Sequence, residues 1–372
     1  NESSFLLELG NLYKFGIGVE KNYTKAIEFY EMSSKLQNSL AMFNLGNMYQ
    51  CGYGVEVDYL KAKDYYELSG QLKNSKALLA LGRLYFEGRG VDQDYPKARY
   101  YYELSSELNN PTALLNLGLL YYHGISVEQN YLKAIEYIEK SAQLNNSNAL
   151  YHLGSMYENG EGVEQDYLKA KEYYELAGKQ NNSEALFNLG LFYFNGSGVE
   201  QDFQKGIKYL ELSSNLNNID AIYNLGLIYY KGIGVDQDYL KAKKYFEIMA
   251  QQQNPLAYFI LGNLYKDEKD YLKAKEYYEL SAKQDNSDAF LNLASLYSDG
   301  LGVKRDYLKA KEYLEKAAKL DNSNALVNLG IFYKEGFGVQ KDYSRARYYF
   351  DLASKQDNSY GFLNLGDLYF YG

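Results

Sequence analysis

The sequence lacks several residue types that particular functions need. It contains one cysteine, Cys51, and no tryptophan. A single cysteine excludes an intrachain disulfide framework and a cysteine-based zinc site. Histidine is almost absent as well, because His123 and His152 are the only two. Neither histidine lies beside a recurring serine or cysteine, so we expect no catalytic centre, no metal site and no cofactor.

Clustered positive charge and long hydrophobic runs are also missing. The formal net charge is −9 and the isoelectric point is about 5.1. A surface that follows nucleic-acid phosphates needs clustered lysine and arginine, so the composition argues against a nucleic-acid partner. It argues more weakly against an anionic membrane surface. The longest apolar runs are only a few residues, and we therefore expect no direct membrane insertion.

Tyrosine is abundant instead, with 44 residues, and much of it belongs to a repeated frame. The frame Leu-Gly-x-x-Tyr-x-x-Gly-x-Gly-Val begins at Leu45 and again 36 residues later, at Leu81. A fixed period predicts a solenoid that grows by adding units. We therefore expect residues 1–372 to form a single solenoid, with repeats that start near residues 5, 41, 77, 113, 149, 185, 221, 257, 289, 325 and 361.

Each repeat contains the patterns of two helices. The frame belongs to the first, and the second reads Tyr-Leu-Lys-Ala-Lys-Glu-Tyr-Tyr-Glu-Leu at 167–176, after Asp166. Asn or Asp precedes this second helix in every repeat, which is typical of an N-cap. Another Asn, such as Asn182, is predicted to cap the first helix. The Asn or Asp often found before it, as at Asn145, suits a left-handed backbone. The sequence predicts an all-α fold of about ten 36-residue helix–turn–helix repeats.

One repeat is shorter than the others. The frame that starts at Leu261 is followed by the next start at Leu293, 32 residues on. The segment 266–270, Lys-Asp-Glu-Lys-Asp, replaces the glycine turn. We expect an unbroken stack with a local change of curvature. A domain boundary at 265–271 is the alternative.

The two ends of the chain give a further expectation. The sequence begins at Asn1 without a methionine, shows no signal peptide, and stops at Gly372 directly after a first helix. Terminal repeats normally carry a polar outer face, which a separate capping helix would supply. We therefore expect both ends to be truncated. The alternative for the C-terminal end is contact with another molecule. The cellular localisation stays open.

The combined pattern resembles a known family. The residues Ala-x-x-x-Leu-Gly-x-x-Tyr-x-x-Gly-x-Gly-Val, a capping Asp and Lys-Ala-x-x-Tyr-Tyr are similar to the Sel1-like repeat, a relative of the tetratricopeptide repeat. The resemblance covers essentially the whole chain. It implies a right-handed superhelical α/α solenoid that acts as a scaffold or adaptor for other proteins. Secreted cysteine-rich members tie each helix pair with a disulfide. This chain has only Cys51, so the lactam-hydrolysing activity suggested for that branch is not carried over.

A row of asparagines is the first candidate binding feature. By analogy with tetratricopeptide solenoids, the first helices line the concave side. The residue just before Leu-Gly is usually Asn, and the row is interrupted by Ala80, His152 and Ile260. Regularly spaced amides can bond both the N–H and C=O groups of an extended peptide. The alternative is that these amides bond a neighbouring helix. The row comprises Asn44, Asn116, Asn188, Asn224, Asn292, Asn328 and Asn364.

Aromatic and apolar residues form the second candidate feature. They lie one residue before the asparagine row and one turn after it, and charged residues are scarce among them in the central repeats. An apolar floor flanked by amides predicts a groove for a peptide or helix. The alternative is that most of these rings pack between adjacent repeats. The nominated residues are Tyr122, Tyr151, Phe187, Leu191, Phe194, Tyr223, Leu227 and Tyr230.

These observations favour a non-catalytic scaffold that binds peptide segments or partner proteins on the concave face. We expect a monomer, with end-to-end association as the alternative. Two other functions stay open on sequence alone. One is a structural spacer or assembly element that uses its uncapped ends. The other is the regulatory region of a larger protein with a fused catalytic domain.

Overall fold

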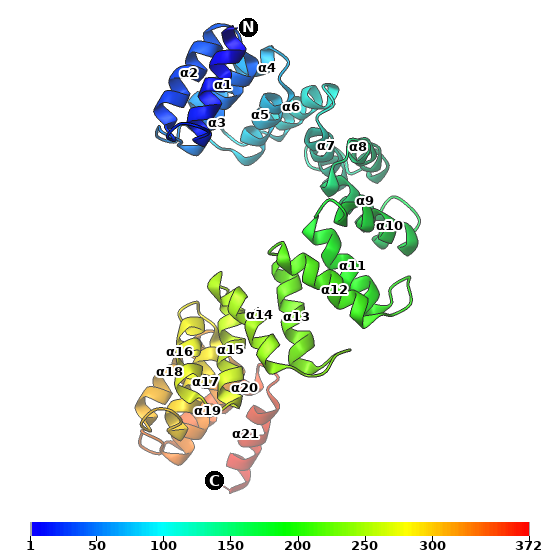
Figure 1. Ribbon diagram of the computed structural model, residues 1–372. Helices are drawn as coiled ribbons and strands as arrows, with labels where there is room; N and C mark the ends of the chain where they lie inside the picture. Colours follow the sequence, from blue (N-terminus) through cyan, green and yellow to red (C-terminus); the bar gives the residue numbers. More distant parts are fainter. Residues whose placement is uncertain (1, 372) are drawn as a thin grey trace. The chain divides into compact units, whose positions relative to one another are not determined.

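The computed structural model describes residues 2–371, and every regular element within them is an α-helix. Helices with the Leu-Gly frame alternate with helices that follow the glycine loop (Figure 1). The predicted all-α solenoid of repeated helix pairs is confirmed. The first and last residues of the chain, Asn1 and Gly372, lie outside the described residues.

The odd-numbered helices contain the frame, and the even-numbered helices contain the capped pattern. The odd-numbered helices are α1 (Glu2–Phe15), α3 (Ser39–Cys51), α5 (Ser75–Glu87), α7 (Pro111–His123), α9 (Ser147–Asn159), α11 (Ser183–Asn195), α13 (Ile219–Lys231), α15 (Pro255–Asp267), α17 (Ser287–Asp299), α19 (Ser323–Glu335) and α21 (Ser359–Tyr371). The even-numbered helices are α2 (Tyr23–Lys35), α4 (Tyr59–Gln71), α6 (Tyr95–Glu107), α8 (Tyr131–Gln143), α10 (Tyr167–Gly178), α12 (Phe203–Asn215), α14 (Tyr239–Gln251), α16 (Tyr271–Ala282), α18 (Tyr307–Lys319) and α20 (Tyr343–Ser354).

The chain divides into two compact units, Asn1–Tyr209 and Leu210–Gly372. The division falls inside α12, whereas the sequence offered 265–271 as the alternative boundary. Consecutive helices pack against each other from α1 to α11 in the first unit and from α13 to α21 in the second. The continuity of a single solenoid over residues 1–372 stays a prediction.

The predicted N-caps explain where the helices begin. Asp58 accepts a hydrogen bond from the backbone N–H of Lys61 at 2.9 Å. Asn38 does the same at the start of α3, and each cap satisfies donors that the first helical turn leaves unpaired. Gly52 ends α3 with a φ of 69°, a conformation that a side chain would strain. The sequence also predicted a left-handed backbone at the Asn or Asp between one repeat and the next. Positive φ angles confirm this prediction at Asn109, Asn145, Asp285, Asp321 and Asp357.

The glycine inside most odd-numbered helices lies against a buried residue of the following helix. A Cβ atom built on Gly154 would lie 2.6 Å from the Tyr174 ring, too close for an undisturbed contact. Tyr174 is fully buried. The predicted contact between a neighbouring helix and the glycine backbone is therefore confirmed. Ala294 replaces the glycine in α17, where the smaller Leu314 stands in place of the ring.

The short repeat keeps its helix pair. Helix α15 ends at Asp267, and α16 begins at Tyr271 with Asp270 as its N-cap. The rings of Tyr265 and Tyr277 still stack, with their centroids 5.4 Å apart. The missing residues therefore shorten the loop without separating the two helices.

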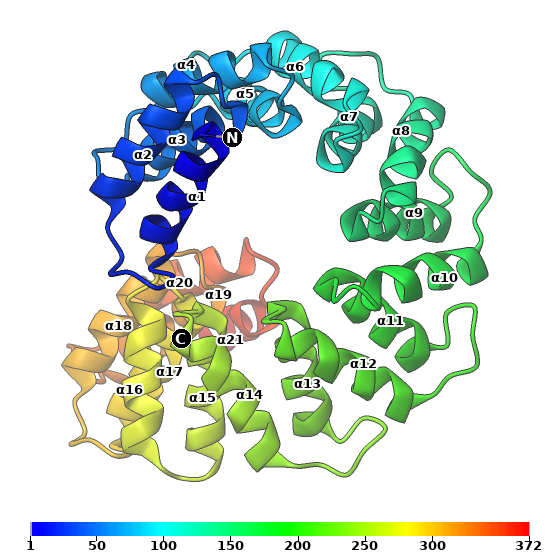
Figure 2. The same cartoon turned by 45° about the horizontal axis from the view of Figure 1, so that its top comes forward.

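The odd-numbered helices of the first unit share one side of it. Figure 2 shows α3, α5, α7, α9 and α11 on the inner side of the arc that the helix pairs of this unit form, with the even-numbered helices outside. Side chains on neighbouring odd-numbered helices can therefore contribute to one surface. Among residues 2–371, no helix has the length and apolar character that a membrane crossing requires.

Candidate functional site

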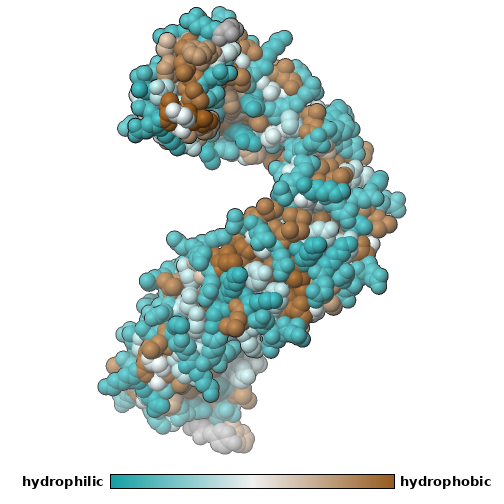
Figure 3. Space-filling model, in the orientation of Figure 1, coloured by the Kyte–Doolittle hydropathy of each residue, from teal (hydrophilic) through white to brown (hydrophobic). Residues whose placement is uncertain are grey.

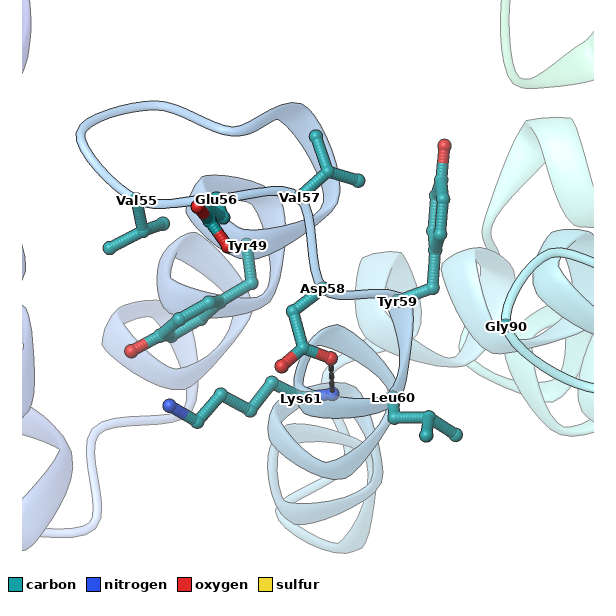
Figure 4. Close-up of a pocket in the computed structure, with 9 residues that line it drawn as sticks. All are labelled: Tyr49, Val55, Glu56, Val57, Asp58, Tyr59, Leu60, Lys61 and Gly90. Atoms are coloured by element: carbon teal, nitrogen blue, oxygen red, sulfur yellow. Dashed lines mark hydrogen bonds between the residues drawn. The ribbon is translucent and has the colours of Figure 1, made fainter.

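Each repeat stacks two aromatic rings and a cation where its two helices meet. Tyr49 of α3 stacks on Tyr65 of α4 with ring centroids 5.7 Å apart, and Lys61 Nζ lies 4.8 Å from the Tyr49 centroid. Figure 4 shows Lys61 extending toward Tyr49 while Asp58 accepts a hydrogen bond from the Lys61 backbone. The hollow of about 560 Å³ drawn there is lined by frame, loop and cap residues that recur along the chain. The frame tyrosine is therefore structural.

The asparagine before Leu-Gly in α11 covers the hydroxyl of a buried tyrosine. Asn188 Nδ2 donates to the Tyr174 hydroxyl at 2.9 Å, and that hydroxyl donates to Glu158 Oε2 at 2.6 Å. Asn116 of α7 is likewise hydrogen-bonded to Tyr102, a buried tyrosine of the preceding helix α6. Burial raises the pKa of Tyr102 to about 12, so its hydroxyl stays protonated and available for these bonds. These amides join neighbouring repeats, as the alternative interpretation of the row expects.

Asn44 of α3 is likewise hydrogen-bonded to the buried Tyr30, and its Nδ2 also donates to Asn11 Oδ1 of α1 at 3.4 Å. Another member of the row has a different partner. In the second unit, the buried residue that corresponds to Tyr174 is Leu210, which offers Asn224 no hydroxyl. Asn224 Nδ2 donates instead to the Asp220 carbonyl of its own helix, at 2.7 Å. The row is thus a set of locally different bonds rather than one uniform ladder.

The nominated aromatic residues of α9 and α11 pack within their own helix pairs. The Tyr151 ring lies 5.9 Å from the Tyr174 ring, and the Phe194 ring meets Phe203 edge-on at 5.0 Å. Each nonetheless keeps part of its surface exposed, as does Phe187 of α11. The packing partner is mostly the helix that follows in the same repeat, whereas the sequence alternative placed it in the adjacent repeat.

Tyr122 of α7 bridges to the next glycine loop. Its hydroxyl donates to Glu161 Oε2 at 2.6 Å, and its ring meets Tyr131 edge-on at 5.4 Å. Burial and the bond to Glu161 both raise the pKa of Tyr122. A bond that spans two repeats gives this tyrosine a structural role beside any contact with a ligand.

The second unit carries the remaining nominated residues, all on α13. The Tyr223 ring meets the buried Phe246 ring at 6.4 Å, and the Tyr230 ring meets Tyr239 at 5.6 Å. Leu227 is half-buried on the same helix. These residues and Asn224 form a group of their own, because the others belong to the first unit. All twelve nominated residues of both groups are half-buried, so each keeps surface for a ligand, and their binding role stays a prediction.

Comparison with a repeat-family model accounts for almost the entire chain. The Sel1 repeat model matches ten consecutive segments, whose limits follow the helix pairs. This chain belongs to the Sel1 repeat family. Sel1 repeat proteins are generally non-catalytic scaffolds that bind protein partners. The matched segments are residues 3–38, 39–74, 75–110, 111–146, 147–182, 183–218, 219–254, 255–286, 287–322 and 323–358.

Solved structures of Sel1 repeat proteins resemble this chain along most of its length. A protective antigen of uropathogenic Escherichia coli that displays an SLR fold is 32% identical, with a TM-score of 0.65 over 98% of this chain and 79% of that chain. A Sel1 repeat protein from Oxalobacter formigenes is 29% identical, with a TM-score of 0.62 over 67% of this chain and 100% of that chain. No curated protein matches the sequence.

The two histidines lie in neighbouring Sel1 repeats. His152 occupies the asparagine-row position in α9, and His123 ends α7. Burial lowers the pKa of His152, and the nearby His123 lowers it further. Among residues 2–371, no three or more His, Cys, Asp and Glu side chains gather where they could hold a metal ion.

One Sel1 repeat carries a feature that the sequence reasoning missed. In the sequence pattern, Ala80 is only an interruption of the asparagine row. In the structure it lies in a hollow of about 430 Å³ between α3, α5 and the start of α7, together with Lys76 and Arg83. The available signal was the spacing of these three residues, which places both cations and the small side chain on one face of α5.

Proposed function

We propose that this chain is a non-catalytic interaction scaffold that binds a peptide segment of a partner protein. The binding surface is that of the odd-numbered helices in the first unit. The observation that carries the proposal is the composition of this surface. Helices α3 and α7 contain no Lys, Arg, Asp or Glu, yet half-buried rings and amides remain partly exposed on them. Such a surface loses water at low cost and can bond a peptide backbone.

The half-buried state of these side chains also supports the proposal. Hydrogen bonds and ring contacts fix Tyr122, Tyr151 and Asn188 in the unbound chain. Side chains that are already ordered lose little rotamer entropy when they bind. Membership of a family of interaction scaffolds points the same way.

A peptide display library tests this proposal. The chain of residues 1–372 should enrich particular peptides, and fluorescence polarisation should show that Phe187→Ser with Leu191→Ser weakens their binding. The matched control is Leu132→Ser with Leu168→Ser, because these leucines of α8 and α10 are 73% and 60% exposed on the even-numbered helices. Circular dichroism verifies that both variants fold. No enrichment, or equal losses in both variants, would contradict the proposal.

Self-association through an end helix is a second candidate. Helix α21 exposes large apolar side chains, among them Phe362 and Phe370. Helix α1 exposes Phe5 and Phe15, and Figure 3 shows hydrophobic side chains gathered over it. Light scattering over a range of concentrations separates the two functions, because an assembly element should increase in mass while a monomeric scaffold should not.

A further inference from the structure

We propose that the hollow on α5, defined by Lys76, Ala80 and Arg83, binds an acidic peptide segment of a partner protein. An apolar side chain of that segment enters the hollow, and two carboxylates bind the flanking cations. The inference rests on the proposed scaffold function and specifies the chemistry of one peptide site within it.

The hollow exists because of a single small side chain. Ala80 occupies the row position that holds Asn44 in α3 and Asn116 in α7. Alanine lacks the amide that would extend over the ring of Tyr66. The resulting space measures about 430 Å³, which is within the range of sites that accept a small ligand or a side chain.

The floor of the hollow is apolar and rigid. The half-buried Phe43 ring lies 5.8 Å from the ring of Tyr66, which is fully buried. Leu79 of α5 is half-buried beside them and lines the same hollow. An apolar side chain of a ligand would therefore meet an ordered apolar surface, which favours its transfer out of water.

The polar groups around this floor supply hydrogen-bond donors. The Tyr66 hydroxyl lies 2.8 Å from Asn47 Oδ1 and 2.7 Å from Gln50 Oε1. Its single proton can serve only one of these oxygens, so at least one of the two amides keeps its NH₂ group for another acceptor. Among residues 2–371, no side chain or backbone group accepts a hydrogen bond from that NH₂ group. A ligand that only accepts hydrogen bonds, such as a carboxylate, fits this set.

The two cations add net positive charge with no carboxylate of their own. Lys76 and Arg83 are exposed, and no ion pair joins either of them to another residue between 2 and 371. Glu87 lies one turn after Arg83 but pairs with Arg89 instead, at 2.7 Å. The adjacent helices α3 and α7 are uncharged. On a chain with a net charge of −9, this local excess of positive charge selects an acidic partner.

The spacing of the cations defines the peptide. Lys76 and Arg83 are seven residues apart on one helix, which corresponds to about 10 Å along the axis at 1.5 Å per residue. An extended peptide in the polyproline II conformation covers about 9 Å in three residues and brings the side chains of the first and fourth residues to the same side. The matching segment therefore has an acidic residue, an apolar residue, any residue and a second acidic residue, in that order.

Fluorescence polarisation with a labelled Gly-Ser-Asp-Leu-Ser-Glu-Ser-Gly peptide and the chain of residues 1–372 tests the inference. We expect saturable binding that weakens as salt is added, because salt screens exposed charges. A peptide with Asn and Gln in place of Asp and Glu should bind at least about tenfold more weakly. A peptide with Ser in place of Leu should also lose affinity. Equal binding of all three peptides would overturn the inference.

Protein variants test the same site from the other side. Lys76→Gln and Arg83→Gln should each lower the affinity for the peptide about tenfold, since each removes a charged hydrogen-bond donor. Ala80→Asn should weaken it by a similar factor because the amide fills the hollow. The matched control, Lys133→Gln, removes the same single positive charge from an even-numbered helix and should bind normally. Urea unfolding establishes that every variant is folded.

Two results separate this inference from the proposed function. If the chain enriches library peptides on its odd-numbered helices but ignores the acidic probe, the α5 inference fails and the scaffold function stands. If no peptide of any kind binds, both fail. Inorganic phosphate is the competitor that distinguishes a general anion site. Displacement of the probe by equimolar phosphate would overturn the assignment of an acidic peptide, whereas retention of the probe supports it.

Discussion

Helices α5 and α11 are built on the same frame but present different surfaces. Lys76, Ala80 and Arg83 of α5 correspond to Glu184, Asn188 and Leu191 of α11, three repeats later. The ring beneath the row position is a fully buried tyrosine in both repeats. In α11 the amide covers the tyrosine hydroxyl, whereas in α5 a hollow stays open and cations flank it.

Some features of the repeat are the same in α5 and α11, whereas the surface residues differ. The glycine and the stacked tyrosines are the same in both repeats because they hold the two helices together. The residue just before Leu-Gly and the residues one helical turn away from it lie at the surface of the helix pair. A few substitutions there convert a closed, hydrogen-bonded surface into an open, cationic one without a change of fold.

The largest expected effect concerns the shared part of the frame. Gly46→Ala and Gly154→Ala should destabilise the protein to a similar degree, because each new Cβ atom would overlap a buried tyrosine ring. Overpacking costs about 1–3 kcal/mol, more than the roughly 1 kcal/mol that alanine contributes to helix propensity. Urea unfolding measures both changes.

A glycine without a neighbour provides the control for this pair. A Cβ atom added to Gly366 of α21 would meet no other atom within 4 Å, so Gly366→Ala should not destabilise the protein. A loss of stability at only one of Gly46 and Gly154 would show that the two repeats do not share the same packing.

An intermediate effect should follow from exchanging the row residues. Asn188→Ala removes the donor to the Tyr174 hydroxyl and should lower the free energy of unfolding by about 0.5–1.5 kcal/mol, the net value of one hydrogen bond. Ala80→Asn adds an amide to an open hollow and should change stability by less than about 0.5 kcal/mol. Equal and large losses in both variants would contradict the distinction between a closed and an open repeat.

The smallest expected effect concerns the third version of the row position, His152 of α9. Burial and His123 hold the folded-state pKa of His152 below its ordinary value. Its contribution to stability is therefore present above the unfolded pKa of about 6.5 and is lost as the pH falls below that value. Unfolding midpoints measured between pH 7.5 and 5.5 should fall slightly in the wild type.

Two variants isolate this titration. His152→Asn should flatten the dependence on pH, because no neutral, half-buried histidine then has to take up a proton. His123→Asn should retain most of it, because burial of His152 is the larger cause of its lowered pKa. An unchanged slope in His152→Asn would show that another group is responsible.

Much of the fold was predictable because repetition averages out the ambiguity of single positions. The caps at Asp58 and Asn38 and the left-handed residue at Asn109 follow from local chemistry that recurs with the repeat. The shortened loop at 266–270 was visible as a change of period. The stacking of a cation on a pair of aromatic rings in each repeat was not predicted, because it joins residues of two helices whose relative rotation the period does not specify.

The candidate site was less predictable, because amphipathic periodicity does not show how much of each side chain stays exposed. The row containing Asn188 suggested free amides, whereas the structure shows that Asn188 and Asn116 bond tyrosines of the preceding repeat. Ala80 stands out in the sequence only as an exception. Its importance depends on residues of α3, α5 and α7 that lie far apart in sequence and meet only after the helices pack.

By itself, the sequence determined the helices, their limits and the class of solenoid, because period, caps and turn glycines act over a few residues. Only the tertiary structure decided which surface side chains are already engaged and where a hollow remains. The physical reason is that hydrogen bonding and exposure depend on the distance between side chains of neighbouring repeats, and packing sets that distance.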